Sequence, residues 1–114
     1  MRNLLVTVLF VFALSSCSSP RFLYSWYDYE DASYQYEKNQ TPKSEENLSK
    51  SFQKVMKKQK GSRLVVPPGI YAENGYMLIK AGKKEEGLSL LKKEIELYPE
   101  SQVFIGRIVK QIEK

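Results

Sequence analysis

Hydrophobic residues follow two different patterns along the chain. Near the start, residues 4–14 form an apolar run of eleven residues that only Thr7 interrupts. This run is too short for a helix that crosses a bilayer, which needs about 20 residues, but it has the length of the apolar core of a secretory signal peptide. Farther along, apolar residues are spaced as on one face of a helix. The pattern predicts a cleaved signal peptide over residues 1–16 and a helical domain over residues 24–114.

Five segments of the second part have apolar residues at every third or fourth position and are separated by Pro or Gly, which indicates five helices. We expect them at residues 28–39, 41–60, 68–81, 84–98 and from Ser101 toward the C-terminus. The apolar connector 64–66 is followed by Pro67 and Pro68, which prevent it from continuing as a central strand. The expected fold class is all-α, a small domain of about five helices behind the signal peptide.

Residues at the ends of these segments are typical of helix caps. Thr41 or Ser44 can cap the second helix, and Pro68 suits the first turn of the third. Gly82 suits the end of the third helix, and Ser101 can cap the last. The last helix has an apolar face made of Phe104, Ile105, Ile108, Val109 and Ile112. The second helix carries lysines that we expect in solvent: Lys50, Lys54, Lys57 and Lys58.

The apolar run ends in Leu14-Ser15-Ser16-Cys17, which resembles the lipobox of bacterial lipoproteins. The resemblance implies that acyl chains such as palmitate are attached to Cys17, which becomes the new N-terminus, with residues 17–23 as a lipidated tether. The alternative is an ordinary signal peptide with a chance cysteine. Ser18 follows where an Asp often signals inner-membrane retention, so we expect the outer membrane, on its periplasmic face.

The composition of the chain excludes several kinds of partner and site. The net charge of +5 suits anionic lipid headgroups or an acidic partner, while export argues against a nucleic-acid partner. The chain has one cysteine and no histidine, which excludes an internal disulfide, the Cys/His zinc sites and any catalytic triad that contains His. We therefore expect no metal, no cofactor and no catalytic residues.

Residues 68–101 resemble one tetratricopeptide repeat, a helical hairpin of about 34 residues. Gly75 and Gly87 are small where the paired helices of that repeat approach closely, and Pro99 stops the second helix. Apolar contacts and the turn come from Tyr71, Leu78, Leu91 and Gly82. Asn74 and Glu94 depart from the repeat, where Leu and Ala are more usual. A generic helical hairpin is the alternative.

The whole chain also resembles the DUF4810 family of small lipoproteins. Apart from the lipobox, the resemblance is carried by residues 24–29, 45–48, 66–73 and 98–101. Tyr27 takes the place after the tryptophan where a glycine is frequent in the family. Members of the family are often encoded beside lipoproteins related to the curli secretion channel, which implies such a lipoprotein as a partner.

Two candidate binding surfaces follow. In a tetratricopeptide hairpin the first helix lines the concave face, which here presents Ala72, Tyr76, Ile79 and Lys80. Tyr76 and Lys80 can hold a peptide by apolar contact and charge, although Tyr76 and Ile79 can equally well pack against a neighbouring helix. The second candidate is the aromatic segment 24–36, including Trp26 and Tyr27. Its aromatics can fill the core, bind a partner or rest at the membrane interface.

The sequence thus favours an outer-membrane lipoprotein that acts as a protein-binding accessory or adaptor subunit of a cell-envelope complex. A pilotin-like chaperone for an outer-membrane channel subunit is the alternative. An envelope enzyme is less favoured, because it needs acid and base groups that converge in a cleft. The carboxylates are expected to face solvent: Glu30, Asp31, Glu85, Glu86, Glu94 and Glu96.

Overall fold

The computed structural model describes residues 1–14 and 21–114, and the described part is all-helical, without strands. Its elements are α1 (Arg2–Leu14), α2 (Tyr29–Lys38), α3 (Pro42–Lys57), α4 (Ile70–Lys80), α5 (Lys84–Leu97), the 3-10 turn η1 (Pro99–Ser101) and α6 (Gln102–Glu113). The expected all-α class, with five α-helices after α1, is confirmed. Cys17 and the rest of the segment 15–20 lie outside the described residues.

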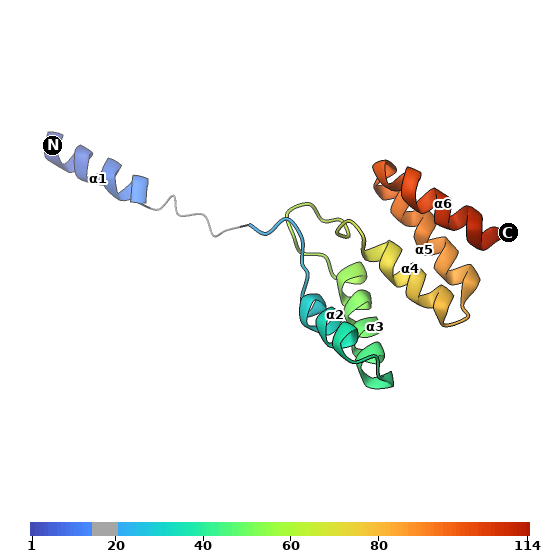
Figure 1. Cartoon of the computed structure of the whole chain (residues 1–114). Helices are drawn as coiled ribbons and strands as arrows, with labels where there is room; N and C mark the ends of the chain where they lie inside the picture. The colour runs from blue at the N-terminus through green and yellow to red at the C-terminus, as the bar shows by residue number, and fades with distance from the viewer. Residues whose placement is uncertain (15–20) are drawn as a thin grey trace.

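α1 lies apart from the other helices (Figure 1). Its described side chains are exposed although most are apolar, including Leu4, Leu5 and Leu9. Among the described residues, no helix is both long and apolar enough to cross a membrane.

The remaining helices form two antiparallel hairpins, α2–α3 and α4–α5, with α6 packed along α5 (Figure 1). Two groups of buried side chains hold them together. The first cluster joins α2 and α3 to the start of α4 and contains Ala32, Leu48, Phe52, Val55, Val66 and Ile70. The second cluster joins α5 and α6 and contains Leu88, Leu91, Ile105 and Val109.

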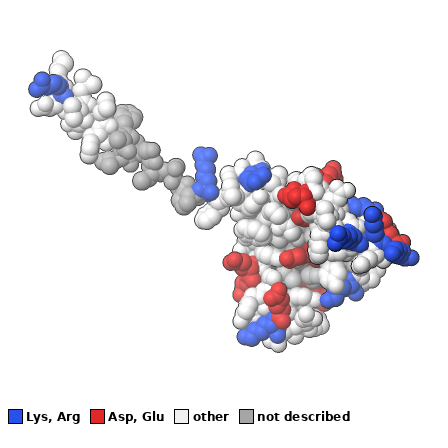
Figure 2. All heavy atoms as spheres, turned by 45° about the horizontal axis from the view of Figure 1, so that its top comes forward, with Lys and Arg blue, Asp and Glu red and all other residues white. Residues whose placement is uncertain are grey.

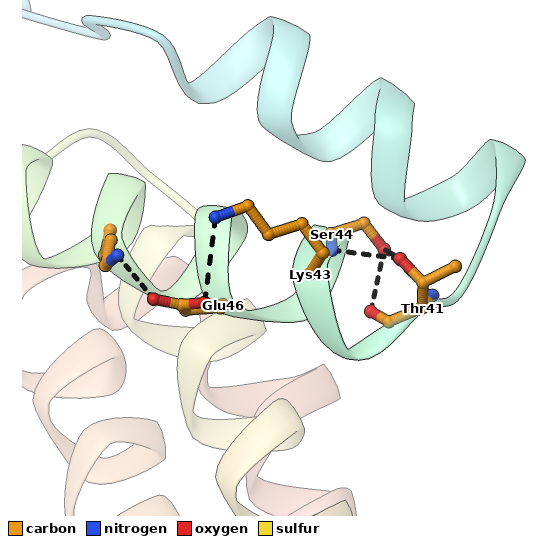
Figure 3. A network of polar contacts seen from close by, with 5 residues as sticks. Thr41, Lys43, Ser44 and Glu46 are labelled. Carbon is orange, nitrogen blue, oxygen red and sulfur yellow. Dashed lines mark hydrogen bonds and ion pairs between the residues drawn. The ribbon is translucent and has the colours of Figure 1, made fainter.

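The start of α3 confirms the expected cap and adds to it. The Thr41 side chain accepts a hydrogen bond from the Ser44 backbone N–H at 3.1 Å, and the Thr41 backbone N–H donates to Ser44 Oγ at 3.0 Å (Figure 3). This reciprocal arrangement satisfies two N–H groups that a helix start leaves unpaired. One turn along the helix, Glu46 lies between Lys43 and Lys50 on the exposed side (Figure 3).

α3 ends at Lys57, before the expected position 60. Its continuation is diverted by the segment that precedes α2. The Lys60 backbone N–H donates to Ser25 Oγ at 3.1 Å, and Gln59 Nε2 donates to the Ser25 carbonyl oxygen at 2.8 Å. The Lys60 contact replaces the helical hydrogen bond of its N–H, and Gln59 Nε2 also donates to the Val55 carbonyl oxygen at 2.9 Å, the acceptor that the Gln59 backbone N–H would use in a helix.

α4 also begins later than expected. Pro68 is not its first helical residue, because Gly69 follows with φ +93°, outside the helical region, and the helix starts at Ile70. At the other end, Gly82 has φ +85° and turns the chain out of the helix as expected. Leu64–Val66 forms no strand, which confirms the expected connector.

Two expectations for α6 are met only in part. Ser101 occupies the N-cap position, but its hydroxyl makes no cap hydrogen bond and instead donates to the Tyr98 carbonyl oxygen at 2.7 Å across the preceding 3-10 turn. Phe104 is 71% exposed, whereas Ile105 and Val109 are buried. The buried stripe of α6 is therefore narrower than the apolar face in the sequence, since α6 packs mainly against α5 and η1.

Candidate interaction surfaces

The first candidate surface lies on α4. Tyr76 is 53% exposed, and the Lys80 ammonium lies 5.8 Å from the centre of the Tyr76 ring. The two side chains are one turn apart on one helix face, at a distance at which a cation is attracted to an aromatic ring. Together they offer an apolar ring and a positive charge to the exterior.

The other two residues of this candidate surface do not share the exposure of Tyr76 and Lys80. Ala72 and Ile79 are half-buried and pack against the second cluster. Ile79 lies directly beside Gly87 of α5, where a Cβ would come within 2.5 Å of Ile79 Cγ1. The chain itself thus uses half of the expected groove, and the exposed part is Tyr76 with Lys80.

The aromatic segment divides between core and surface. Tyr29 packs against Phe52 with ring centres 5.6 Å apart, and Tyr36 also lies against the first cluster. Trp26 lies 5.6 Å from the Tyr29 ring and is 39% exposed, while Tyr27 is 46% exposed. The inner aromatics fill the core, and Trp26 and Tyr27 remain available on the surface.

Trp26 and Tyr27 border a hollow of about 840 Å³ between the segment before α2 and the loop after α3. The Tyr27 hydroxyl donates to the Lys58 carbonyl oxygen and so closes one side. Tyr27 has φ +52°, in the left-handed region that favours glycine. Tyr27 thus has a backbone conformation typical of glycine, the residue that is frequent at this position in the family that the chain resembles.

Glu94 was wrongly expected in solvent. It is 2% exposed, and its Oε1 accepts a hydrogen bond from the Gly69 backbone N–H at 2.7 Å, while Oε2 has no partner among the described residues. Glu94 thereby joins α5 to the start of α4. The departure from alanine at this position of the repeat was the sequence signal for this role.

Asn74, the second departure from the repeat, is also buried, and its Nδ2 lies 3.6 Å from Met56 Sδ of α3. Tyr29 adds another link between the hairpins through a hydrogen bond from its hydroxyl to Glu73 of α4. Burial, followed by that bond to a carboxylate, raises the pKa of Tyr29. Polar side chains therefore connect the α2–α3 hairpin to α4.

Tyr98 fixes the end of α5. Its hydroxyl donates to the Val66 carbonyl oxygen at 2.6 Å, which holds the connector against the helix. Burial is the largest cause that raises the pKa of Tyr98 to about 12, and a hydrogen bond with Tyr24 adds to it. Within the described ranges, no three Asp, Glu, Cys or His side chains gather as metal ligands would.

These features define a small all-helical protein of two linked hairpins with polar and aromatic surface patches. The chain belongs to the DUF4810 family, a domain of unknown function whose family model matches residues 23–108. The match includes both hairpins and most of α6. No curated protein and no solved structure matches the chain.

Proposed function

We propose that this protein is an outer-membrane lipoprotein, anchored through acyl chains on Cys17, that binds another protein as an adaptor subunit of an envelope complex. The observation that carries the adaptor role is the exposed Tyr76–Lys80 pair on a helix whose other side is packed. Tyrosine is among the residues that dominate binding energy at protein interfaces. A partner with an acidic or carboxylate group beside an apolar side chain fits this pair.

The proposed anchor rests on the leader and on the sequence Leu14-Ser15-Ser16-Cys17. Each buried CH₂ of an acyl chain contributes about 0.8 kcal/mol, so several chains hold a protein on a membrane permanently whereas one does so only weakly. Such an anchor keeps the adaptor in the plane of its partner. A lipoprotein related to the curli secretion channel is the partner that the family resemblance favours.

A second candidate is a pilotin-like chaperone that escorts a channel subunit. Val103 and Phe104 favour it, because both are at least 70% exposed on neighbouring positions of α6. An apolar patch of this kind suits a client that is itself apolar before assembly. The two functions differ in their consequence: a chaperone's loss misplaces the client, whereas an adaptor stays in the complex.

The test is capture of the tagged full-length protein from native membranes after crosslinking. We expect a partner with wild type and loss of that partner with Tyr76→Ala plus Lys80→Ala. Tyr34→Ala is the matched control, because Tyr34 is a tyrosine exposed to a similar degree on α2. Retention of the same partner by the Tyr76 and Lys80 variant would contradict the proposal.

A further inference from the structure

The hollow beside Trp26 belongs to a surface made of two segments, residues 21–27 and 57–64, here named the loop pair. Backbone hydrogen bonds join the segments, from Ser62 N–H to the Phe22 carbonyl oxygen at 2.9 Å and from Arg63 N–H to the Leu23 carbonyl oxygen at 3.2 Å. Gly61 lies so close that a Cβ there would come within 2.2 Å of that Leu23 oxygen. The loop pair is therefore a built surface, held together across the chain.

Apolar side chains project from the loop pair into solvent. Phe22 is 76% exposed, Leu23 58% and Leu64 72%. Leu64 has φ +53°, a conformation that leucine adopts only at a cost in free energy and that glycine or asparagine adopts readily. Phe22 and Leu23 are neighbours in the first segment and Leu64 ends the second, so the loop pair exposes three large apolar side chains.

The loop pair is also rich in positively charged residues. The two segments contain five cationic residues and no Asp or Glu: Arg21, Lys57, Lys58, Lys60 and Arg63. The Arg63 guanidinium lies 5.9 Å from the centre of the Tyr24 ring. Figure 2 shows blue side chains near the N-terminal end of the folded part, which the loop pair occupies. The two segments thus combine exposed apolar side chains with a net positive charge.

We propose that the loop pair binds the membrane surface, with its cations on anionic lipid headgroups and its apolar side chains at the headgroup boundary. Basic residues are attracted to anionic lipids, and Trp and Tyr are favoured at the interface. The proposal rests on the proposed lipidation. Because four residues span at most about 14 Å, acyl chains on Cys17 would keep Arg21 next to the bilayer.

This contact would set the orientation of the protein relative to the membrane. α4 begins after the connector that follows the loop pair and runs away from it (Figure 1). Its C-terminal half carries Tyr76 and Lys80. With the loop pair on the membrane, this exposed pair faces away from the bilayer toward a partner.

Trp26 is the natural reporter, since it is the only tryptophan and lies within the loop pair. The experiment uses the purified full-length lipoprotein, with its acyl chains verified by mass, in vesicles of phosphatidylethanolamine and phosphatidylglycerol with brominated acyl chains. We expect these lipids to quench the Trp26 emission. Quenching should weaken as salt rises to 1 M, where charges more than about 3 Å apart are screened.

Two variants test the two components of the contact. Lys58→Glu plus Lys60→Glu should reduce quenching, because each lost cation lowers the ratio of docked to undocked protein by roughly fivefold. Leu64→Asn should also reduce it, and asparagine tolerates the backbone conformation of that position. The matched control is Lys84→Glu plus Lys110→Glu, which makes the same charge change on α5 and α6 and should leave quenching unchanged.

The outcomes separate this inference from the proposed function. If the protein is acylated but Trp26 is not quenched, the loop-pair contact is wrong and the proposed anchor is unaffected. The same conclusion follows if Trp26 is quenched but neither loop-pair variant changes the quenching. Protein that carries no acyl chains overturns the anchor and the contact together. The adaptor role is tested separately by capture of the partner.

Discussion

Gly75 and Gly87 face each other across the α4–α5 hairpin, where the backbones of the two helices touch. A Cβ on Gly87 would lie 2.4 Å from the Gly75 carbonyl oxygen and 2.5 Å from Ile79 Cγ1, and a Cβ on Gly75 would lie 2.8 Å from the Gly87 carbonyl oxygen. Such distances leave no room for a methyl group. The close approach of the two helices therefore requires a residue without a side chain at both positions.

Gly87→Ala should therefore destabilise the protein by about 1–3 kcal/mol, the usual cost of an overpacked core. Urea unfolding followed by circular dichroism measures the change. Gly106→Ala in α6 is the control, because its Cβ would meet only Gln102 Cγ at 3.9 Å. We expect it to stabilise by up to about 1 kcal/mol through helix propensity. Equal effects of the two changes would contradict the close approach.

Glu94→Ala should cost about 1–3 kcal/mol in the free energy of unfolding. The change removes the acceptor of the Gly69 N–H and leaves that partly buried donor without its partner. Glu94→Gln keeps an acceptor oxygen and should cost less. Thermal unfolding of both variants beside wild type provides the measurement, and an alanine variant as stable as wild type would show that the bond is unimportant.

The stabilisation that Asp28 contributes through its contacts with α3 should depend on pH. Lys54 Nζ lies 3.1 Å from Asp28 Oδ2 and Ser51 Oγ donates to Oδ1, and the Lys54 bond is the main cause that lowers the pKa of Asp28 below 3.8. The stabilisation is therefore complete above pH 4 and is lost as pH falls through the lowered pKa.

Asp28→Asn should cost about 0.5–1 kcal/mol near neutral pH, a small value because both charged groups are half-exposed to solvent. The difference from wild type should shrink toward pH 2. Chemical unfolding at a series of pH values checks this. If the difference in the free energy of unfolding stays constant down to pH 2, the charge of the Asp28 carboxylate does not contribute to stability.

Tyr98→Phe should destabilise by about 1–2 kcal/mol, because the Val66 carbonyl oxygen loses its donor in a buried place. The pH dependence has the opposite sign to that of Asp28. The pKa of Tyr98 is raised to about 12, so its contribution is complete below pH 10 and is lost as pH rises toward 12. Unfolding measured at neutral and alkaline pH tests both parts, and a phenylalanine variant as stable as wild type would contradict them.

The helices could be predicted from sequence because their signals are local. The spacing of apolar residues located all five, and Thr41 and Gly82 marked boundaries through their own chemistry. The errors came from contacts between distant segments. α3 ends early because residues near Ser25 bind the loop after it, and α4 starts late because Gly69 turns its N–H toward Glu94.

The candidate surfaces show the same division. Helical spacing placed Tyr76 and Lys80 on one face of the helix, and the structure shows both side chains exposed. The spacing could not distinguish this pair from Ala72 and Ile79, because their burial depends on where α5 and α6 pack. The loop pair was not foreseen. Its segments are about 35 residues apart and are joined by backbone and side-chain hydrogen bonds that leave no periodic pattern.

The most direct test of the adaptor role is photo-crosslinking in intact cells from a benzoylphenylalanine placed at Tyr76, with the same group at Tyr34 as the matched exposed control. We predict one discrete adduct from position 76 that contains a second envelope protein, is absent from position 34 and is lost when Lys80 is changed to Ala. No adduct from position 76, or the same adduct from both positions, would contradict the proposed adaptor function.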